Sequence, residues 1–130
     1  MAGEPILVVD DNPTNLRLLR LLLSGESYAV RTAGDAGEAL AVLKEFRPRL
    51  ILLDLQMPGM DGFELARRLK SDAATQDIVI VALTAYAMKG DEERAREAGC
   101  DGYVSKPIDT RALPAIIARH LEGANPEASA

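Results

Sequence analysis

The chain has 130 residues, enough for one domain, and 48% of them are hydrophobic and 27% charged, which excludes a disordered or collagen-like chain. The net charge of −5 argues against a surface that coats nucleic acid, and no hydrophobic run approaches the length of a membrane span. A single cysteine, Cys100, and a single histidine, His120, argue against an internal disulfide, a Cys- or His-based zinc site and a Ser-His-Asp triad. The first residues lack the basic start of a signal peptide, so we expect a cytoplasmic protein.

Five short runs rich in branched hydrophobic residues predict the strands of a sheet. Stretches with helical spacing fill the gaps between the runs, and strands that alternate with helices predict a parallel sheet built of βαβ units. The runs cover residues 6–9, 28–32, 50–53, 78–83 and 103–105.

The composition of the runs predicts the order of the strands. The first, third and fourth runs are hydrophobic throughout, as buried central strands are, whereas the second and fifth are mixed and suit the edges. With right-handed crossovers this predicts an α/β fold, doubly wound, with the strand order 2-1-3-4-5. Ligands of such sheets bind at the carboxyl ends of the strands where the winding reverses, here between the first and third strands.

Local signals predict where the helices begin. Asn12 can cap a helix that starts at Pro13 and carries leucines at 16, 19 and 23 and at 18 and 22. Asp35 with Glu38 has the spacing of a capping box, and Asp61 with Glu64 repeats it before the third helix.

The last third of the chain gives weaker helical signals. Residues 87–98 contain almost no large hydrophobic side chain, so the fourth helix is expected to be weakly anchored. The fifth helix is expected over residues 110–121, with a late or loose start because Pro114 cannot donate a backbone hydrogen bond. We expect one domain over residues 1–122 and a mobile tail over 123–130.

Polar residues close four of the five runs. Asp10 and Asp11 follow the first, Asp54 the third, Thr84 the fourth and Lys106 the fifth. In the predicted order, three carboxylates crowd one edge at about the 5 Å spacing of adjacent strands, and like charges this close require a cation. Oxygen ligands without His or Cys suit Mg²⁺, and three carboxylates, one lysine and one Mg²⁺ together are electrically neutral. Such a site can accept a phosphoryl group held by the metal and the lysine.

A structural explanation competes with this functional one. A carboxylate that follows a strand is often only a helix cap, and for a single aspartate we favour that explanation. For the whole set, on four strands of one sheet, we favour a site.

The residues around these strand ends resemble the response-regulator receiver domain of two-component signalling. The matching segments are ILVVDDN at 6–12, LLDLQMPGMDG at 52–62, VALTA at 81–85 and YVSKPI at 103–108. Together they extend over about residues 5–121, and their combination is highly specific. The stretch 84–107 is similar to stand-alone cell-division regulators and to receivers of hybrid histidine kinases. The resemblance implies a flavodoxin-like receiver fold with five helices.

The resemblance also implies a role for each matching residue. Asp54 would accept a phosphoryl group from a histidine kinase or a histidine phosphotransfer protein. Mg²⁺ would be held by Asp10, Asp11, Asp54 and the backbone carbonyl of Gln56. Lys106 and Thr84 would contact the phosphoryl oxygens, and Tyr103 would turn inward when Thr84 moves. From position alone, Gln56 and Tyr86 are candidates for setting the lifetime of the phosphorylated state.

We therefore expect a phosphorylation-operated switch rather than an enzyme, with no output domain of its own. Its downstream protein partner would bind the surface of the fourth helix, fifth strand and fifth helix. The runner-up surface is the leucine-rich first helix, which a kinase helical bundle would meet. A receiver excised from a hybrid histidine kinase remains an alternative. An aspartate-dependent phosphohydrolase would need an Asp-x-Asp pair, whereas Asp10 and Asp11 are adjacent. A flavodoxin-like cofactor protein would need a phosphate loop that the sequence lacks.

Overall fold

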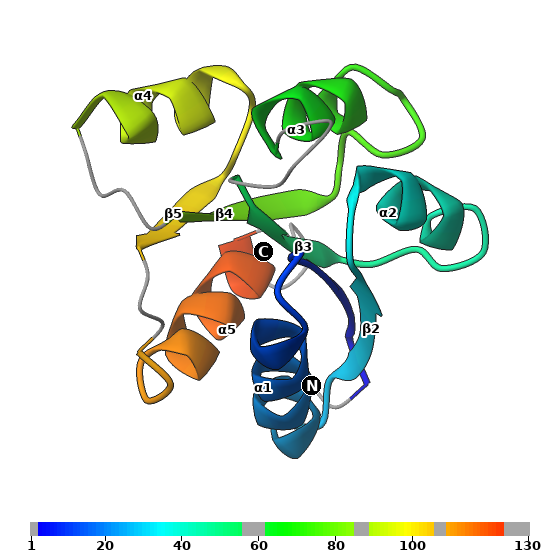
Figure 1. Cartoon of the computed structure of the whole chain (residues 1–130), viewed down its shortest axis with the longest axis vertical. Coiled ribbons are helices and arrows are strands. Elements are labelled where there is room, and N and C mark those ends of the chain that lie inside the picture. The colour runs from blue at the N-terminus through cyan, green and yellow to red at the C-terminus, as the bar shows by residue number, and fades with distance from the viewer. Residues whose placement is uncertain (1–2, 56–61, 85–88, 106–108, 124–130) are drawn as a thin grey trace.

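The computed structural model describes residues 3–55, 62–84, 89–105 and 109–123. These residues form strands and helices in strict alternation, coloured from blue to red along the chain in Figure 1. The elements are β1 (Pro5–Val9), α1 (Pro13–Gly25), β2 (Ala29–Ala33), α2 (Ala36–Val42), β3 (Leu50–Asp54), α3 (Gly62–Lys70), β4 (Val79–Thr84), α4 (Lys89–Glu97), β5 (Gly102–Ser105) and α5 (Leu113–Gly123).

The five strands form one parallel sheet in the order β2-β1-β3-β4-β5, which confirms the prediction. Every residue of β3 and β4 is buried, as are the last four of β1, whereas β2 and β5 carry half-buried and exposed residues. Composition predicted this difference because a central strand is covered on both faces and an edge strand is not. The end of β1, the start of β3 and the end of β5 agree with the prediction, and every other strand boundary differs from it by a single residue.

Helices cover both faces of the sheet (Figure 1). One hydrophobic core lies beneath α1 and α5, whose buried leucines and isoleucine pack on the side chains of one sheet face. The other core lies beneath α2, α3 and α4. Side chains of a strand alternate between the two faces, so Ile6 and Val8 enter the first core and Leu7 and Val9 the second.

Two of the three predicted caps lie within the described residues and are present, whereas Asp61 lies outside them. The Asn12 side chain accepts hydrogen bonds from the backbone N–H groups of Thr14 and Asn15, and Pro13 is the first residue of α1. Asp35 accepts from the Glu38 N–H group at 2.7 Å. Glu38 reaches back to the N–H group of Gly34 rather than to that of the cap residue, so the capping box closes one residue earlier than its standard form.

The start of α5 differs from the predicted one, since α5 begins at Leu113, three residues later. Pro114 therefore lies in the first turn of α5, where backbone N–H groups make no hydrogen bond within the helix, so the lack of an N–H group on proline costs nothing. The expected late start of this helix is confirmed. Asp109 caps the preceding turn by accepting from the N–H groups of Arg111 and Ala112. The predicted start of α4 near residue 87 lies outside the described residues, within which α4 covers Lys89–Glu97.

The leucines of α1 divide between the core and the surface. Leu19 and Leu23 are buried and Leu16 and Leu22 half-buried, but Leu18, which shares the helical spacing, is 41% exposed. Among the described residues, no helix is long and hydrophobic enough to span a membrane.

Candidate functional site

The register of the parallel strands brings the predicted site residues to one edge of the sheet. Val9 pairs with Leu53 and Asp54 pairs with Leu83, so Asp10 follows β1 beside the residue that ends β3. Thr84 ends β4 opposite Ser105 of β5. The strand ends thus meet where the sequence predicts.

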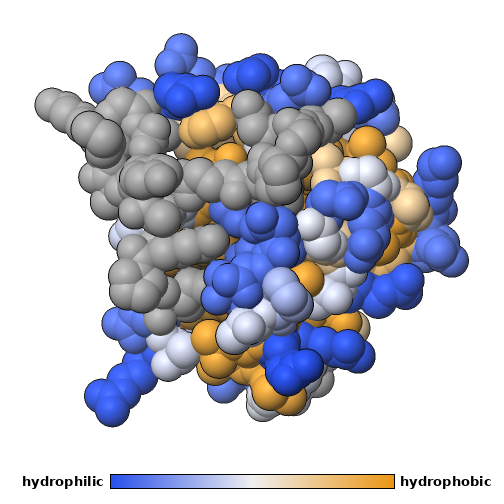
Figure 2. All heavy atoms as spheres, viewed as in Figure 1, coloured by the Kyte–Doolittle hydropathy of each residue, from blue (hydrophilic) through white to orange (hydrophobic). Residues whose placement is uncertain are grey.

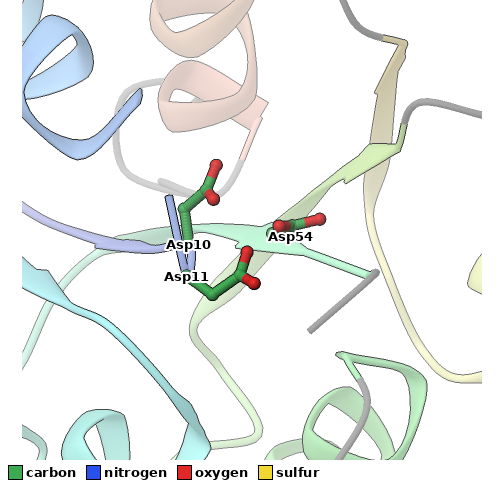
Figure 3. Close-up of side chains that lie close together, drawn as sticks. All are labelled: Asp10, Asp11 and Asp54. Carbon is green, nitrogen blue, oxygen red and sulfur yellow. The ribbon is translucent and has the colours of Figure 1, made fainter. Parts of the chain in front are cut away.

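Three carboxylates gather at this edge, from the ends of β1 and β3 (Figure 3). Asp10, Asp11 and Asp54 each offer a carboxylate oxygen, and these oxygens lie within 4.8 Å of one another. Asp10 is 0% exposed and Asp54 is 1% exposed, whereas Asp11 is exposed to solvent. Two buried carboxylates beside a third concentrate negative charge that a bound cation would offset, so the arrangement can form a cation site.

The ligand set fits a hard divalent cation. Every potential metal ligand is a carboxylate oxygen. Asp10 and Asp54 are held in place by burial, and the exposed Asp11 leaves one side of the group open to water. Mg²⁺ binds few protein carboxylates and keeps several waters, whereas zinc favours nitrogen and sulfur ligands. The three aspartates could therefore hold Mg²⁺.

Hydrogen bonds orient the Asp10 side chain. One carboxylate oxygen accepts from the backbone N–H group of Asn12 at 2.9 Å, and the other accepts from the Asn15 side-chain amide at 3.3 Å. The sequence analysis did not identify Asn15 as a site residue. The sequence did contain a signal for it, because Asn15 lies in the first turn of the helix that follows Asp10 and an amide there can reach back to the aspartate.

Gly62 packs directly against the backbone of Asp54 and Leu55, and the sequence analysis did not identify it as a site residue. A Cβ atom at Gly62 would lie 2.5 Å from the Asp54 carbonyl oxygen and 2.6 Å from the Leu55 Cα atom. Backbone atoms cannot retreat as a flexible side chain can, so α3 starts directly against the residue that ends β3 only because residue 62 has no side chain. The sequence shows a glycine here, but not what it touches.

The other predicted residues divide into two groups. Thr84 is fully buried at the end of β4, and Tyr103 is half-buried against the core beneath α2, α3 and α4. Lys106, Gln56 and Tyr86 lie outside the residues that the structure describes, so their predicted roles remain predictions.

Cys100 lies away from this site, between α4 and β5. Burial, reinforced by the negative charge of Asp101, raises the pKa of its thiol to about 11, against a partial opposing effect of Lys70. The thiol is therefore protonated near neutral pH, as suits a packed residue rather than a redox sensor.

Comparisons with known proteins point to one family. The family model described as "Response regulator receiver domain" matches residues 6–118. The polar-differentiation response regulators DivK of Brucella anthropi and Brucella ovis are each 40% identical to this chain over 118 residues, which cover 91% of this chain and 96% of theirs.

Solved structures agree with that match. A CheY-like response regulator receiver domain protein from Methanospirillum hungatei JF-1 superimposes with a TM-score of 0.89 at 30% identity, covering 97% of this chain and 99% of that one. The receiver domain of the sensor histidine kinase PA1611 from Pseudomonas aeruginosa PAO1 gives a TM-score of 0.83 at 32% identity, covering 92% and 98%. That structure has a magnesium ion coordinated in its active-site cleft.

Proposed function

This chain belongs to the response regulator receiver domain family, the phosphoacceptors of two-component signalling, and we propose that Asp54 is its phosphoacceptor residue. The observation that carries the proposal is the group of three carboxylates at the ends of β1 and β3. Asp54 stands at the end of a fully buried central strand, so its side chain has a fixed position at the carboxyl edge of the sheet.

Asp10, Asp11 and Asp54 would hold Mg²⁺, with the backbone carbonyl of Gln56 as a further ligand. The metal would supply positive charge that offsets the negative charge of the phosphoryl group and of the three carboxylates. The hydrogen bonds from Asn12 and Asn15 fix the Asp10 carboxylate before the metal arrives, which lowers the ordering cost of binding.

The Asp54 carboxylate would attack the phosphorus atom of a phosphohistidine on a histidine kinase or phosphotransfer protein. The new oxygen–phosphorus bond forms as the nitrogen–phosphorus bond breaks, and the leaving imidazole takes up a proton from solvent. Thr84 and Lys106 would contact the phosphoryl oxygens, in the manner of electrostatic clamps in other phosphoryl transfers.

We infer two protein-binding surfaces. Thr84 and Tyr103 lie on the adjacent strands β4 and β5, so a change at Thr84 can reach the surface of α4, β5 and α5 that would bind a downstream partner. On α1, Leu18 is 41% and Leu21 68% exposed beside the exposed Arg17 and Arg20. Figure 2 shows hydrophobic side chains at the surface over α1, as a face that meets a kinase would have.

The test of Asp54 is covalent labelling. The full chain is incubated with acetyl phosphate and Mg²⁺, and its intact mass is measured. We expect one added phosphoryl group on the unmodified sequence and none on Asp54→Ala. Asp35→Asn is the matched control. Asp35 also follows a strand, β2, and Asn can replace Asp as the N-cap residue of α2. Equal labelling of Asp54→Ala would place the nucleophile elsewhere.

A further inference from the structure

α4 is weakly anchored to the rest of the molecule. Of the side chains described between residues 93 and 98, only Ala95 and Ala98 are buried, and both are small. A buried methyl group contributes far less hydrophobic free energy than the buried leucines of α1 and α3. Contacts other than hydrophobic burial must therefore contribute to the position of α4.

One such contact joins α4 to α3. The Arg94 guanidinium lies over the Phe63 ring, 4.2 Å from the ring centroid, and Phe63 is only 7% exposed. This is well within the range of a cation–π interaction, which strengthens as the pair loses water. A planar guanidinium can also stack on a ring face, which an ammonium cannot do.

Phe63 connects this contact to the candidate site. It directly follows Gly62, which lies against the Asp54 carbonyl oxygen and the Leu55 Cα atom. The Gly62 N–H group donates to the Leu55 carbonyl at 3.4 Å, and the Leu55 N–H group donates to the Leu83 carbonyl at 2.9 Å. A displacement of the backbone at Asp54 therefore moves the first turn of α3, and with it the ring on which Arg94 rests.

Arg94 lies in the last turn of α4, and the segment that follows this helix is attached to α3 separately. Lys70 donates to the Asp101 carboxylate at 3.0 Å and to the Ile78 carbonyl at 2.8 Å, and its aliphatic stem runs directly against Gly99. Between this attachment and the Arg94–Phe63 contact, the two helices border an open groove of about 610 Å³ whose lining includes Arg68 and Glu97. α4 is thus fixed at its C-terminal end and held against α3 by Arg94.

We propose that Arg94 is a positioning residue that couples α4 to the backbone of the phosphoacceptor site through Phe63 and Gly62. The first part of this proposal, that Arg94 holds α4 against α3, depends only on the contacts described above. The consequence for signalling rests on the function proposed above: the response of α4 to phosphorylation of Asp54 passes in part through this contact, in addition to any route through Thr84 and Tyr103.

The first experiment uses the full chain without any phosphodonor and measures amide hydrogen exchange. Arg94→Gln should speed exchange in α4 and at the Gly62 and Phe63 amides by about two- to fivefold, the range expected for a partly exposed cation–π pair. Arg94→Lys, which keeps the charge but not the planar stack, should restore part of the protection, and Phe63→Leu should repeat the Arg94→Gln pattern. The matched control is Arg31→Gln, because Arg31 of the edge strand β2 lies over the Phe46 ring at 5.2 Å, at the edge of the sheet away from α4.

The outcomes separate a positioning role from a local one. If exchange is faster in α4 but unchanged at Gly62 and Phe63, Arg94 stabilises α4 only locally, and the proposed coupling between α4 and the phosphoacceptor site is overturned. Unchanged exchange in α4, or the same change in Arg31→Gln, would overturn the contact as a determinant of the position of α4.

The second experiment adds acetyl phosphate and Mg²⁺ and monitors intact mass alongside exchange. The phosphorylation-induced change in α4 should be about two- to fivefold smaller in Arg94→Gln than in the unmodified sequence at equal labelling. An undiminished change would overturn the coupling. If the mass of the unmodified sequence does not rise, the proposed function fails instead, and the first experiment still decides the contact between Arg94 and Phe63.

Discussion

Asp10 shows how single residues prepare the candidate site. Its carboxylate is fully buried, and it accepts hydrogen bonds from a backbone N–H group and from the Asn15 side chain. Asp11, its neighbour in sequence, is exposed. Asp10 directly follows the buried end of β1 and Asp11 lies one residue further from the sheet, so the first is covered and the second faces water, although both carboxylates lie near Asp54. The buried residue is thereby fixed, and the exposed one is free to complete a metal site.

We predict that Asp11→Asn weakens Mg²⁺ binding by about tenfold or more, because affinity for a divalent cation depends on the number of charged ligands. The free energy of unfolding in the absence of metal should change little, because Asp11 is exposed. A Mg²⁺ titration followed by amide chemical shifts measures the affinity, with Asp35→Asn as the control. Unchanged affinity in Asp11→Asn would remove this residue from the ligand set.

At the scale of elements, Lys70 connects segments that are distant in sequence. From the last turn of α3 it donates to the carbonyls of Gln76 and Ile78 in the connection to β4, and to Asp101 just before β5. The same Asp101 oxygen accepts from the Ile80 N–H group at 2.9 Å. Because the Lys70–Asp101 ion pair is partly exposed, the pair alone contributes little, but hydrogen bonds from a charged donor to backbone carbonyls are stronger.

We predict that Lys70→Met lowers the free energy of unfolding by about 1–3 kcal/mol, since methionine keeps much of the aliphatic stem but none of the three hydrogen bonds. Asp101→Asn should cost less, because an amide oxygen can still accept from Ile80 and from Lys70. Urea unfolding of the two variants and the unmodified chain gives both values. A larger loss in Asp101→Asn than in Lys70→Met would contradict this ranking.

At the scale of the whole molecule, the sheet separates two hydrophobic cores and carries the site at one of its edges. β1 and β3 are central, so the strands that end in Asp10 and Asp54 are covered on both faces. The central strands fix the backbone that carries Asp10 and Asp54, whereas α4 buries only two small side chains among those described between residues 93 and 98.

Leucine truncations at the centre and at the surface should differ sharply. Leu52→Ala, at a fully buried position of β3, should lower the free energy of unfolding by about 2–5 kcal/mol, because it removes buried surface and leaves a cavity. Leu21→Ala, at a position of α1 that is 68% exposed, should change it by less than about 0.5 kcal/mol. Thermal or urea unfolding measures both, and comparable losses would contradict the assignment of Leu52 to the core.

Much of this architecture could be read from local patterns. Strand residues that are buried on both faces must be hydrophobic throughout, so composition alone distinguished β1, β3 and β4 from the edge strands. The strand order then placed Asp10, Asp11 and Asp54 together, because parallel strands end at the same edge. The start of α5 was placed less accurately, since Pro114 gives only a weak signal of where a helix begins.

The sequence by itself determined the alternation of elements, the strand order and the three carboxylates, because each depends on hydrophobic periodicity or on residues at strand ends. Only the tertiary structure decided which side chains from distant segments touch. Arg94 on Phe63 and Lys70 on Asp101 are such contacts. The 31-residue separation of Lys70 and Asp101 illustrates the reason. A local pattern reports whether a side chain is buried, but the angle and distance at which two helices pack against the sheet decide which neighbour buries it.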